Sequence, residues 1–278
     1  MKISRKNILK IFSIIFVLAV FFFFYSDYHS QPRMVIFDVG QGDAIFFRTS
    51  SGEDILIDGG PDKTVLNKLE KNMPFWDRDL EMVVLTHPHS DHLFGLVEVL
   101  KRYDVKKVLL TGVLYGDPAY SYFLDLVAEE GSEIIYPEDI DSLSIDDLEL
   151  QILFPKKSFQ NLEVKNLNNS SIIILANFLD KNILLMGDSE EEIEQELVDD
   201  YDLDIFEVDI LKAGHHGSKT ASSEIFLKEV NPRTTVISCG EDNRFGHPSL
   251  RTMSRLQRNK TTIWRTDIQG DFTLFVGN

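Results

Sequence analysis

Short apolar runs separated by polar or glycine-rich turns make up most of the chain after residue 33. Runs of this length that are rich in β-branched and aromatic residues predict buried strands, whereas longer segments with apolar residues three or four positions apart predict helices. The expected strands are residues 34–39, 44–49, 55–58, 81–86, 106–110, 133–136, 148–154, 171–176, 182–186, 210–212 and 235–238, with strand-like segments over 263–275. The expected helices are residues 93–100, 120–130 and 189–199. Strand-rich halves with interspersed helices predict two sheets face to face with helices outside, in one domain over residues 31–278.

Residues 1–30 differ from this pattern and form a separate unit. Residues 11–25 carry no charge, and residues 7–10 extend the segment to about the 17–25 residues that cross a bilayer. Basic residues precede the segment and Asp27 follows it, so the positive-inside rule predicts a cytoplasmic N-terminus with the rest of the chain outside. We expect an uncleaved signal anchor, that is, a single-pass transmembrane helix. A cleaved signal peptide and a secreted protein is the alternative, but residues 26–32 lack a small-residue cleavage site.

Composition limits the chemistry that the domain can perform. Cys239 is the one cysteine, which excludes an internal disulfide and a cysteine-based zinc cluster, so any metal ligands must be His, Asp or Glu. The net charge of the chain is −17, and residues 31–278 carry about −20 because four of the 28 basic and one of the 45 acidic residues precede them. Such a charge argues against nonspecific adhesion to polyanions. An anionic substrate stays compatible with a site where metal ions dominate the local field.

Residues 87–92, His-Pro-His-Ser-Asp-His, are the most informative segment of the chain. Three of the seven histidines and one carboxylate follow directly after the apolar run 82–85, at a strand-to-helix turn. Imidazole suits Zn²⁺, Fe²⁺ or Mn²⁺, and the spacing allows one loop to supply ligands to two adjacent metal ions. The segment indicates a metal-dependent hydrolase.

Three further segments add candidate ligands after predicted strands. Asp188 follows one strand, the pair His215 and His216 follows another, and His247 lies in a loop further on. Each has a simpler explanation alone, since Asp188 or Ser189 could cap a helix and a lone loop histidine is usually solvated. Together, strand ends that carry His, Asp and His match a metal site at the edge of a sheet.

These residues resemble the metallo-β-lactamase superfamily, in which H-x-H-x-D-H is followed by a later Asp and His. Further motifs make residues 34–278 similar to the hydrolase domain of ComEC-type competence DNA-uptake proteins: Asp-Val-Gly-Gln-Gly-Asp-Ala at 38–44, Leu-Ile-Asp-Gly-Gly at 56–60, Gly-Asp at 187–188, His-His-Gly-Ser-Lys-Thr at 215–220 and Phe-Gly-His-Pro at 245–248. The resemblance implies an α/β fold, a four-layer αββα sandwich.

The resemblance also implies a role for each candidate ligand around two divalent cations, zinc or manganese. His87 and His89 would hold the first ion, Asp91, His92 and His215 the second, and Asp188 would bridge them, while Asp58 would orient the metal-binding loop. The superfamily's third histidine for the first ion is absent between His92 and Asp188. Asn168 and Asn169 occupy the expected place, and an amide oxygen suits Mn²⁺ or Mg²⁺ better than Zn²⁺.

Two such cations promote in-line attack on a phosphoryl group. Asp91 would orient the attacking water, His216, Ser218 and Lys219 would contact phosphate oxygens, and His247 would protonate the leaving oxygen. The expected function is a membrane-anchored, extracytoplasmic phosphodiesterase acting on DNA, working with a separate DNA-uptake channel. Two alternatives stay open: a hydrolase of small lactones, esters or amides, and a non-catalytic binding protein that assists the channel. The oligomeric state is open as well.

Overall fold

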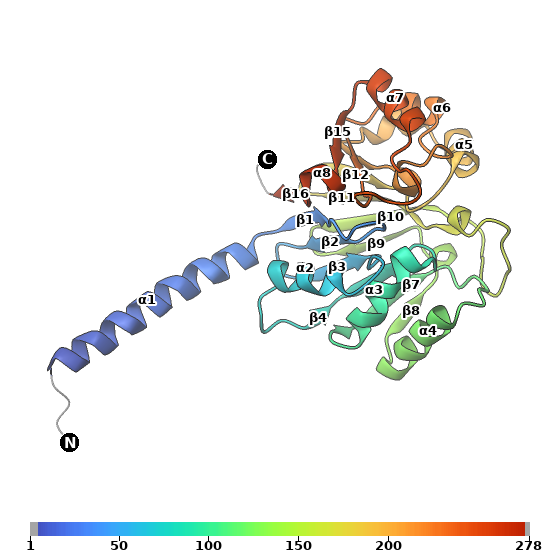
Figure 1. Ribbon diagram of the computed structural model, residues 1–278. Coiled ribbons are helices and arrows are strands. Elements are labelled where there is room, and N and C mark those ends of the chain that lie inside the picture. Colours follow the sequence, from blue (N-terminus) through green and yellow to red (C-terminus); the bar gives the residue numbers. More distant parts are fainter. Residues whose placement is uncertain (1–4, 276–278) are drawn as a thin grey trace.

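The computed structural model describes residues 5–275, which form two seven-stranded sheets packed face to face and a small two-stranded ribbon (Figure 1). The first sheet contains, in spatial order, β16 (Phe272–Phe275), β1 (Arg33–Ile36), β2 (Ile45–Arg48), β3 (Asp54–Ile57), β5 (Met82–Leu85), β7 (Lys107–Leu110) and β8 (Glu133–Ile135). The second contains β15 (Thr262–Arg265), β14 (Thr234–Ile237), β13 (Ile210–Lys212), β12 (Lys181–Leu185), β11 (Ile173–Phe178), β10 (Leu148–Phe154) and β9 (Ser142–Ile145). The ribbon pairs β4 (Asp79–Leu80) with β6 (Asp104–Val105).

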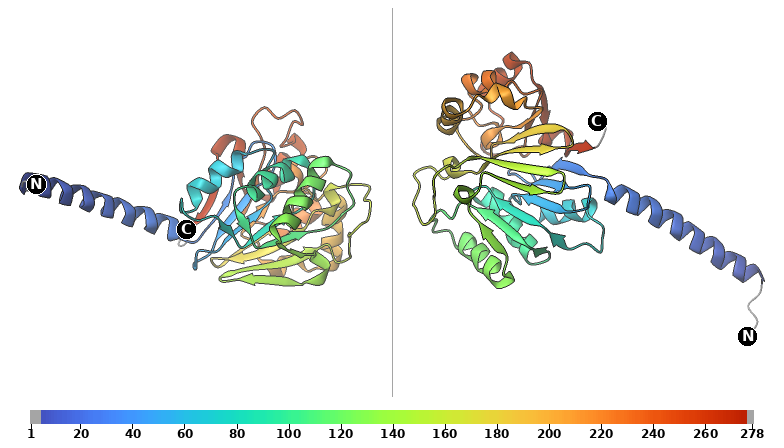
Figure 2. Two further views of the ribbon diagram at one scale, coloured as in Figure 1. Left: turned by 90° about the horizontal axis from the view of Figure 1, so that it is seen from below. Right: turned by 180° about the vertical axis from the view of Figure 1, so that it is seen from behind.

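Helices cover the outer face of each sheet (Figures 1 and 2). The first sheet is covered by α2 (Thr64–Asn72), α3 (Ser90–Leu100) and α4 (Pro118–Glu130), and the second by α5 (Glu191–Asp200), α6 (Glu224–Val230) and α7 (Leu250–Asn259). The short helix α8 (Thr266–Gln269) connects β15 to β16. The predicted α/β arrangement of two sheets with helices outside is confirmed.

Alternating side chains of the strands fill separate cores. On β1, Met34 and Ile36 point into the core between the sheets, whereas Val35 points into the core beneath α2, α3 and α4. This follows from the period of two in a strand, which sends neighbouring side chains to opposite faces. A third core lies between the second sheet and α5, α6 and α7. Strands buried on both faces explain why the sequence shows continuous apolar runs.

Parallel pairing places several strand ends at one edge of each sheet. In the first sheet β3 is parallel to β5, and in the second sheet β12, β13 and β14 are parallel neighbours. The carboxyl ends of parallel strands meet at the same edge, which is where ligands bind in open α/β sheets. The loops after β5, β12 and β13 carry the candidate metal ligands.

The segment predicted to cross a membrane forms helix α1 (Arg5–Ser30), which extends away from the sheets (Figure 1). Among residues 5–275, no helix is long and apolar enough to span a bilayer. The prediction of a transmembrane helix is therefore not confirmed, and the domain limits 1–30 and 31–278 stay predictions.

Glycines allow α3 to pack directly on the loop that follows β3. The Gly59 amide donates a hydrogen bond to the His92 carbonyl at 2.8 Å, and the Gly95 amide donates to the Gly60 carbonyl at 3.0 Å. A Cβ added at Gly95 would overlap the carbonyl oxygen of Gly59. Two backbones in contact cannot move apart by a change of rotamer, so this approach fixes the start of α3 relative to β3.

The Gly95→Ala substitution should lower the free energy of unfolding by about 2 kcal/mol or more, because overpacking against backbone outweighs the roughly 1 kcal/mol gained in helix propensity. Urea unfolding measures the change. Gly116→Ala is the matched control, because a Cβ there meets no atom within 4 Å. Equal stability of the two variants would show that the contact between α3 and the β3 loop is not tight.

Candidate metal centre

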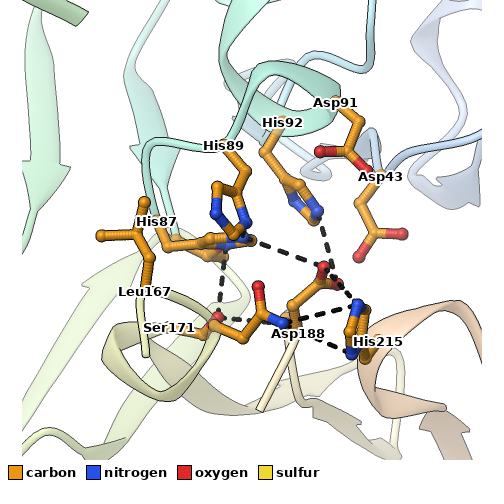
Figure 3. Close-up of polar contacts among 12 residues, drawn as sticks. Asp43, His87, His89, Asp91, His92, Leu167, Ser171, Asp188 and His215 are labelled. Atoms are coloured by element: carbon orange, nitrogen blue, oxygen red, sulfur yellow. Dashed lines mark hydrogen bonds and ion pairs between the residues drawn. The ribbon is translucent and has the colours of Figure 1, made fainter. Parts of the chain in front are cut away.

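Loops from both sheets converge on the carboxylate of Asp188 (Figure 3). Oδ1 of Asp188 lies 3.3 Å from Nε2 of His92 and 3.3 Å from Nε2 of His216. Its Oδ2 lies 3.8 Å from Nε2 of His87 and 4.0 Å from Nε2 of His215. The carboxylate of Asp188 thus lies within 4.0 Å of four imidazole nitrogens, where it could serve the bridging role that the family resemblance implies.

The converging atoms form two groups that could each hold a cation. One contains Asp91, His92, Asp188 and His216, the other His87, His89 and Asp188, and in each group the candidate ligand atoms lie within 4.8 Å of one another. Nε2 of His92, Nε2 of His216 and Oδ1 of Asp188 are buried and find no hydrogen-bond partner within the described residues. Buried polar atoms are normally paired, so these atoms are suited to serve as ligands of a cation. The residues present fit a divalent metal centre.

His216, rather than His215, occupies the second group. The 3₁₀ turn Gly214–Gly217 holds both histidines in left-handed backbone conformations, with φ of 46° for His215 and 53° for His216. Nδ1 of His216 donates a hydrogen bond to the Ser238 carbonyl at 3.0 Å, which turns Nε2 toward Asp188. His215 is 23 % exposed, and its Nδ1 lies 3.0 Å from Oε1 of Glu190. This exchange of the two neighbours concerns the ligand group alone: the sequence predicted His215 there, and the structure places His216 there.

The buried carboxylate of Asp58 holds the loop that carries His92. Its Oδ2 accepts from Nδ1 of His92 at 2.7 Å and from Oγ1 of Thr86 at 2.7 Å, and its Oδ1 accepts from the Thr86 amide at 2.8 Å. With Nδ1 occupied, Nε2 of His92 is the nitrogen that faces Asp188. This is the contact that the predicted orienting role of Asp58 requires.

His87 and His89 present neutral imidazoles to Asp188. Burial lowers the pKa of His87 well below its usual value and lowers that of His89 as well. Nδ1 of His87 lies 3.2 Å from Oγ1 of Thr86 and 3.3 Å from Oγ of Ser171, which leaves Nε2 for ligation. That Nε2 is 3.0 Å from Nδ1 of His89. Neutral imidazole is the form that binds a metal ion.

The remaining charges of the centre are set by neighbouring groups. Burial alone would lower the pKa of His92 and His216, but nearby carboxylates raise both well above the usual histidine value. A cation that binds at Nε2 of these residues would therefore displace the protons that the carboxylates stabilise. Burial would likewise raise the pKa of Asp188, but His216 and His92 outweigh it and hold that pKa well below its usual range. The pKa of Asp91 is also lowered, because the nearby imidazoles of His216 and His92 outweigh burial. An ionised carboxylate is the form that a cation requires.

The two asparagines have different surroundings. Asn168 is buried, and its Oδ1 finds no hydrogen-bond partner among the described residues. Its Nδ2 lies 3.2 Å from Oε1 of Glu190 and 3.4 Å from the His215 ring nitrogens. Asn169 instead bonds to the start of α5, where Oδ1 accepts from the Glu190 amide and Nδ2 donates to Glu192, both at 3.0 Å. Of the two, Asn168 has the free oxygen that a cation would need.

The predicted phosphate contacts and proton donor lie at the edge of the centre or outside it. Oγ of Ser218 is within 3.0 Å of Oγ1 of Thr220, and Lys219 is exposed and lines a separate cavity of 430 Å³. The His247 ring lies 5.4 Å from that of His215. Burial and the two neighbouring histidines lower the pKa of His247 to about 4, which disfavours its predicted role as proton donor.

The sequence did not assign a role to the buried pair Asp43 and Lys212. Lys212 Nζ forms an ion pair with Oδ2 of Asp43 and donates to the Gly187 carbonyl at 3.2 Å, while Oδ1 of Asp43 lies 3.4 Å from Nδ1 of His216. Burial alone would raise the pKa of Asp43, but Lys212 and His216 hold it below its usual value. The available signal was a lysine at the end of an apolar strand, three residues before His215. The sequence also assigned no role to Glu190, because an acidic residue at the start of a helix is common.

Comparison with known proteins supports the interpretation of these residues as a metal centre. The model of the metallo-beta-lactamase superfamily matches residues 37–241. The chain is 30 % identical over 265 residues to ComE operon protein 3 of Bacillus subtilis, a match covering 89 % of this chain and 33 % of that protein. It is 29 % identical over 276 residues to Recombination protein 2 of Haemophilus influenzae, covering 97 % of this chain and 32 % of that protein. The chain spans about a third of the length of these curated relatives.

Solved structures share the fold at low sequence identity. The metallo-beta-lactamase fold protein YhfI from Bacillus subtilis superimposes with a TM-score of 0.56 at 12 % identity, covering 87 % of this chain and 100 % of that one. Igni18, a metallo hydrolase from Ignicoccus hospitalis, gives a TM-score of 0.50 at 15 % identity, covering 88 % of this chain and 98 % of that one. With the family match over residues 37–241, the two sheets and the His/Asp centre, the chain belongs to the metallo-β-lactamase superfamily.

Proposed function

We propose that this chain is a metal-dependent phosphodiesterase that cleaves DNA. The observation that carries the proposal is the set of buried, unpartnered ligand atoms of His92, His216 and Asp188, next to the neutral imidazoles of His87 and His89. Similarity over nearly the whole chain to a protein named Recombination protein 2 supports DNA as the substrate. The expectation of zinc or manganese carries over, with the oxygen of Asn168 favouring the harder ion at the first position.

The ligand sets follow from the geometry. His87, His89 and Asp188 would hold one cation, and we add the unpartnered Oδ1 of Asn168 as a further ligand of that cation. Asp91, His92, Asp188 and His216 would hold the other. Divalent cations there would acidify water at neutral pH and offset the charge that develops on a phosphoryl group.

The side chains at the open side of the centre move the protons. Asp91 is 26 % exposed and ionised, so from its place in the ligand group it can orient the attacking water molecule. His215 is also partly exposed, and Glu190 holds its Nδ1 at 3.0 Å while its Nε2 faces Asp188. We assign His215 to the leaving oxygen in place of His247, because a carboxylate-oriented imidazole can pass on a proton. His216 then acts as a ligand.

Membrane attachment is a second part of the proposal. Helix α1 exposes an apolar surface to solvent, and its exposed side chains include Ile14, Ile15, Phe16, Val17, Leu18, Phe21, Phe22 and Phe23. Where α1 meets the domain, the hydroxyl of Tyr25 accepts a hydrogen bond from the Phe75 amide at 2.9 Å, and the Trp76 ring lies 5.6 Å from that of Phe22. Tyr and Trp are enriched where proteins meet the membrane–water interface. Extracytoplasmic placement and a separate DNA-uptake channel belong to the same proposal.

The proposed activity is tested with labelled single-stranded DNA and bis(p-nitrophenyl) phosphate under titration with Zn²⁺, Mn²⁺ and Mg²⁺. We expect metal-dependent cleavage of both, lowered at least about 10³-fold in the His87→Ala/His89→Ala variant because charge stabilisation worth several kcal/mol is lost. Hydrolysis of lactones or carboxylic esters without DNA cleavage would favour the small-substrate alternative. DNA binding with no turnover under any metal would favour the accessory alternative.

The exchange of the neighbouring histidines predicts opposite effects of two matched substitutions. His216→Ala should weaken metal binding roughly 10- to 100-fold or more, because a buried ligand is lost. His215→Ala should leave metal affinity nearly unchanged and lower kcat, since its role is in proton transfer. Calorimetric metal titration and steady-state kinetics measure both. The reverse pattern would return His215 to the ligand position.

Membrane attachment is tested by sedimentation with phospholipid vesicles. The Phe21→Asp/Phe23→Asp variant should release the chain into the supernatant. The free energy of placing an aspartate in the bilayer is unfavourable, whereas that of placing a phenylalanine there is favourable. Ile205→Asp is the control, since Ile205 is equally exposed but belongs to the 3₁₀ turn Leu203–Phe206 and not to α1. If the wild-type chain stays in the supernatant, or if both variants bind vesicles as the wild type does, α1 is not a lipid-binding helix.

A further inference from the structure

A cleft of 760 Å³ opens directly beside the metal centre. Its lining includes His89, Leu114, Tyr115, Lys165, Asn166 and Leu167. His89 belongs to both the cleft and the first ligand group, so a chain bound in the cleft would lie next to the centre. Clefts of this size are typical of sites that bury a small ligand.

The two walls of the cleft are fixed to each other. Leu114 lies in the segment after β7, and its amide donates a hydrogen bond to the Leu162 carbonyl at 2.9 Å. The Asn161 amide donates to the Gly112 carbonyl at 2.9 Å in the same way. The cleft therefore exists before any ligand binds, and binding does not have to order these segments.

Tyr115 gives the cleft an aromatic wall. Its ring is half-buried against the core beneath α4, and it lies 6.4 Å from the His89 ring at an interplanar angle of 78° and 6.4 Å from the Tyr120 ring. These contacts fix the orientation of the ring next to a candidate metal ligand. Leu114 beside it is 55 % exposed and adds apolar surface.

The charges of the cleft exclude recognition of a polyanion through its phosphates. Lys165 is balanced by Glu163 on the same wall, and the whole chain has a net charge of −17. Binding through phosphate neutralisation needs several cations in a row. A neutral cleft with an aromatic wall instead suits a flat, uncharged ring, and base–aromatic stacking contributes about 1–3 kcal/mol per base without sequence preference.

We propose that this cleft binds an unpaired nucleobase of single-stranded DNA adjacent to the phosphodiester that is cleaved, with the base stacked on Tyr115. The inference rests on the proposed nuclease function and names the form of DNA that the centre accepts. In a duplex the base is paired and stacked within the helix, so its face is not available to Tyr115. The chain thus selects single strands by stacking and the scissile phosphate by its metal centre.

The experiment compares wild type, Tyr115→Ala and Tyr115→Phe on a short single-stranded oligothymidine and on an abasic oligonucleotide of equal length. Tyr115→Ala should raise KM for oligothymidine roughly 5- to 100-fold with little change in kcat, as the loss of one stacked base predicts. Tyr115→Phe should stay within about twofold of wild type, because the phenyl ring still stacks. Tyr122→Ala is the control for removal of an exposed tyrosine, since Tyr122 lies on α4 outside the cleft.

Fluorescence anisotropy with the same labelled oligonucleotides tests the cleft even if no metal supports turnover. Binding of oligothymidine should weaken in Tyr115→Ala, and the slope of log affinity against log salt should correspond to no more than about two phosphates. Absence of cleavage with this binding pattern would reject the nuclease function and keep the cleft assignment. Equal binding of the abasic strand, of duplex DNA or of Tyr115→Ala would overturn the assignment.

Discussion

The buried carboxylate of Asp188 is the charge on which the arrangement of the molecule depends. It comes from the second sheet, yet His92 from the first sheet and His216 from the second both lie 3.3 Å from its Oδ1. A buried carboxylate without counter-charges is strongly destabilising. The two halves of the sandwich are thus held in register by electrostatics as well as by the apolar core between the sheets. Asp43 and Lys212 extend the network beneath His216.

Rigid backbone contacts keep this network in place. The close approach of Gly59 and Gly95 fixes α3, and Asp58 then holds His92 through Nδ1. In the second sheet, the turn 214–217, with its left-handed backbone at His215 and His216, fixes the position of His216. Ligands that are held before a cation arrives need little reorganisation on binding. The walls of the cleft at Tyr115 are likewise held together by backbone hydrogen bonds.

Strand positions and the 87–92 segment could be predicted because apolar runs and ligand spacing are local properties of the sequence. Helices α6 and α7 were not predicted, since each buries only three residues on one face and is otherwise polar. The inward-facing member of the pair His215 and His216 depends on φ angles of 46° and 53°, which adjacent identical residues do not reveal. The ion pair of Asp43 with Lys212 joins the two sheets. It could not be predicted, because the two residues are far apart in the sequence and meet only in the folded chain.

The central claim is that two cations share Asp188, with His216 as a ligand of the second. Anomalous X-ray scattering from crystals grown with Mn²⁺ tests it most directly. We expect two peaks per chain, one next to His87, His89 and Asp188 and one next to Asp91, His92, Asp188 and His216. A centre without peaks, or a second ion bound by His215 while His216 faces away, would contradict the claim.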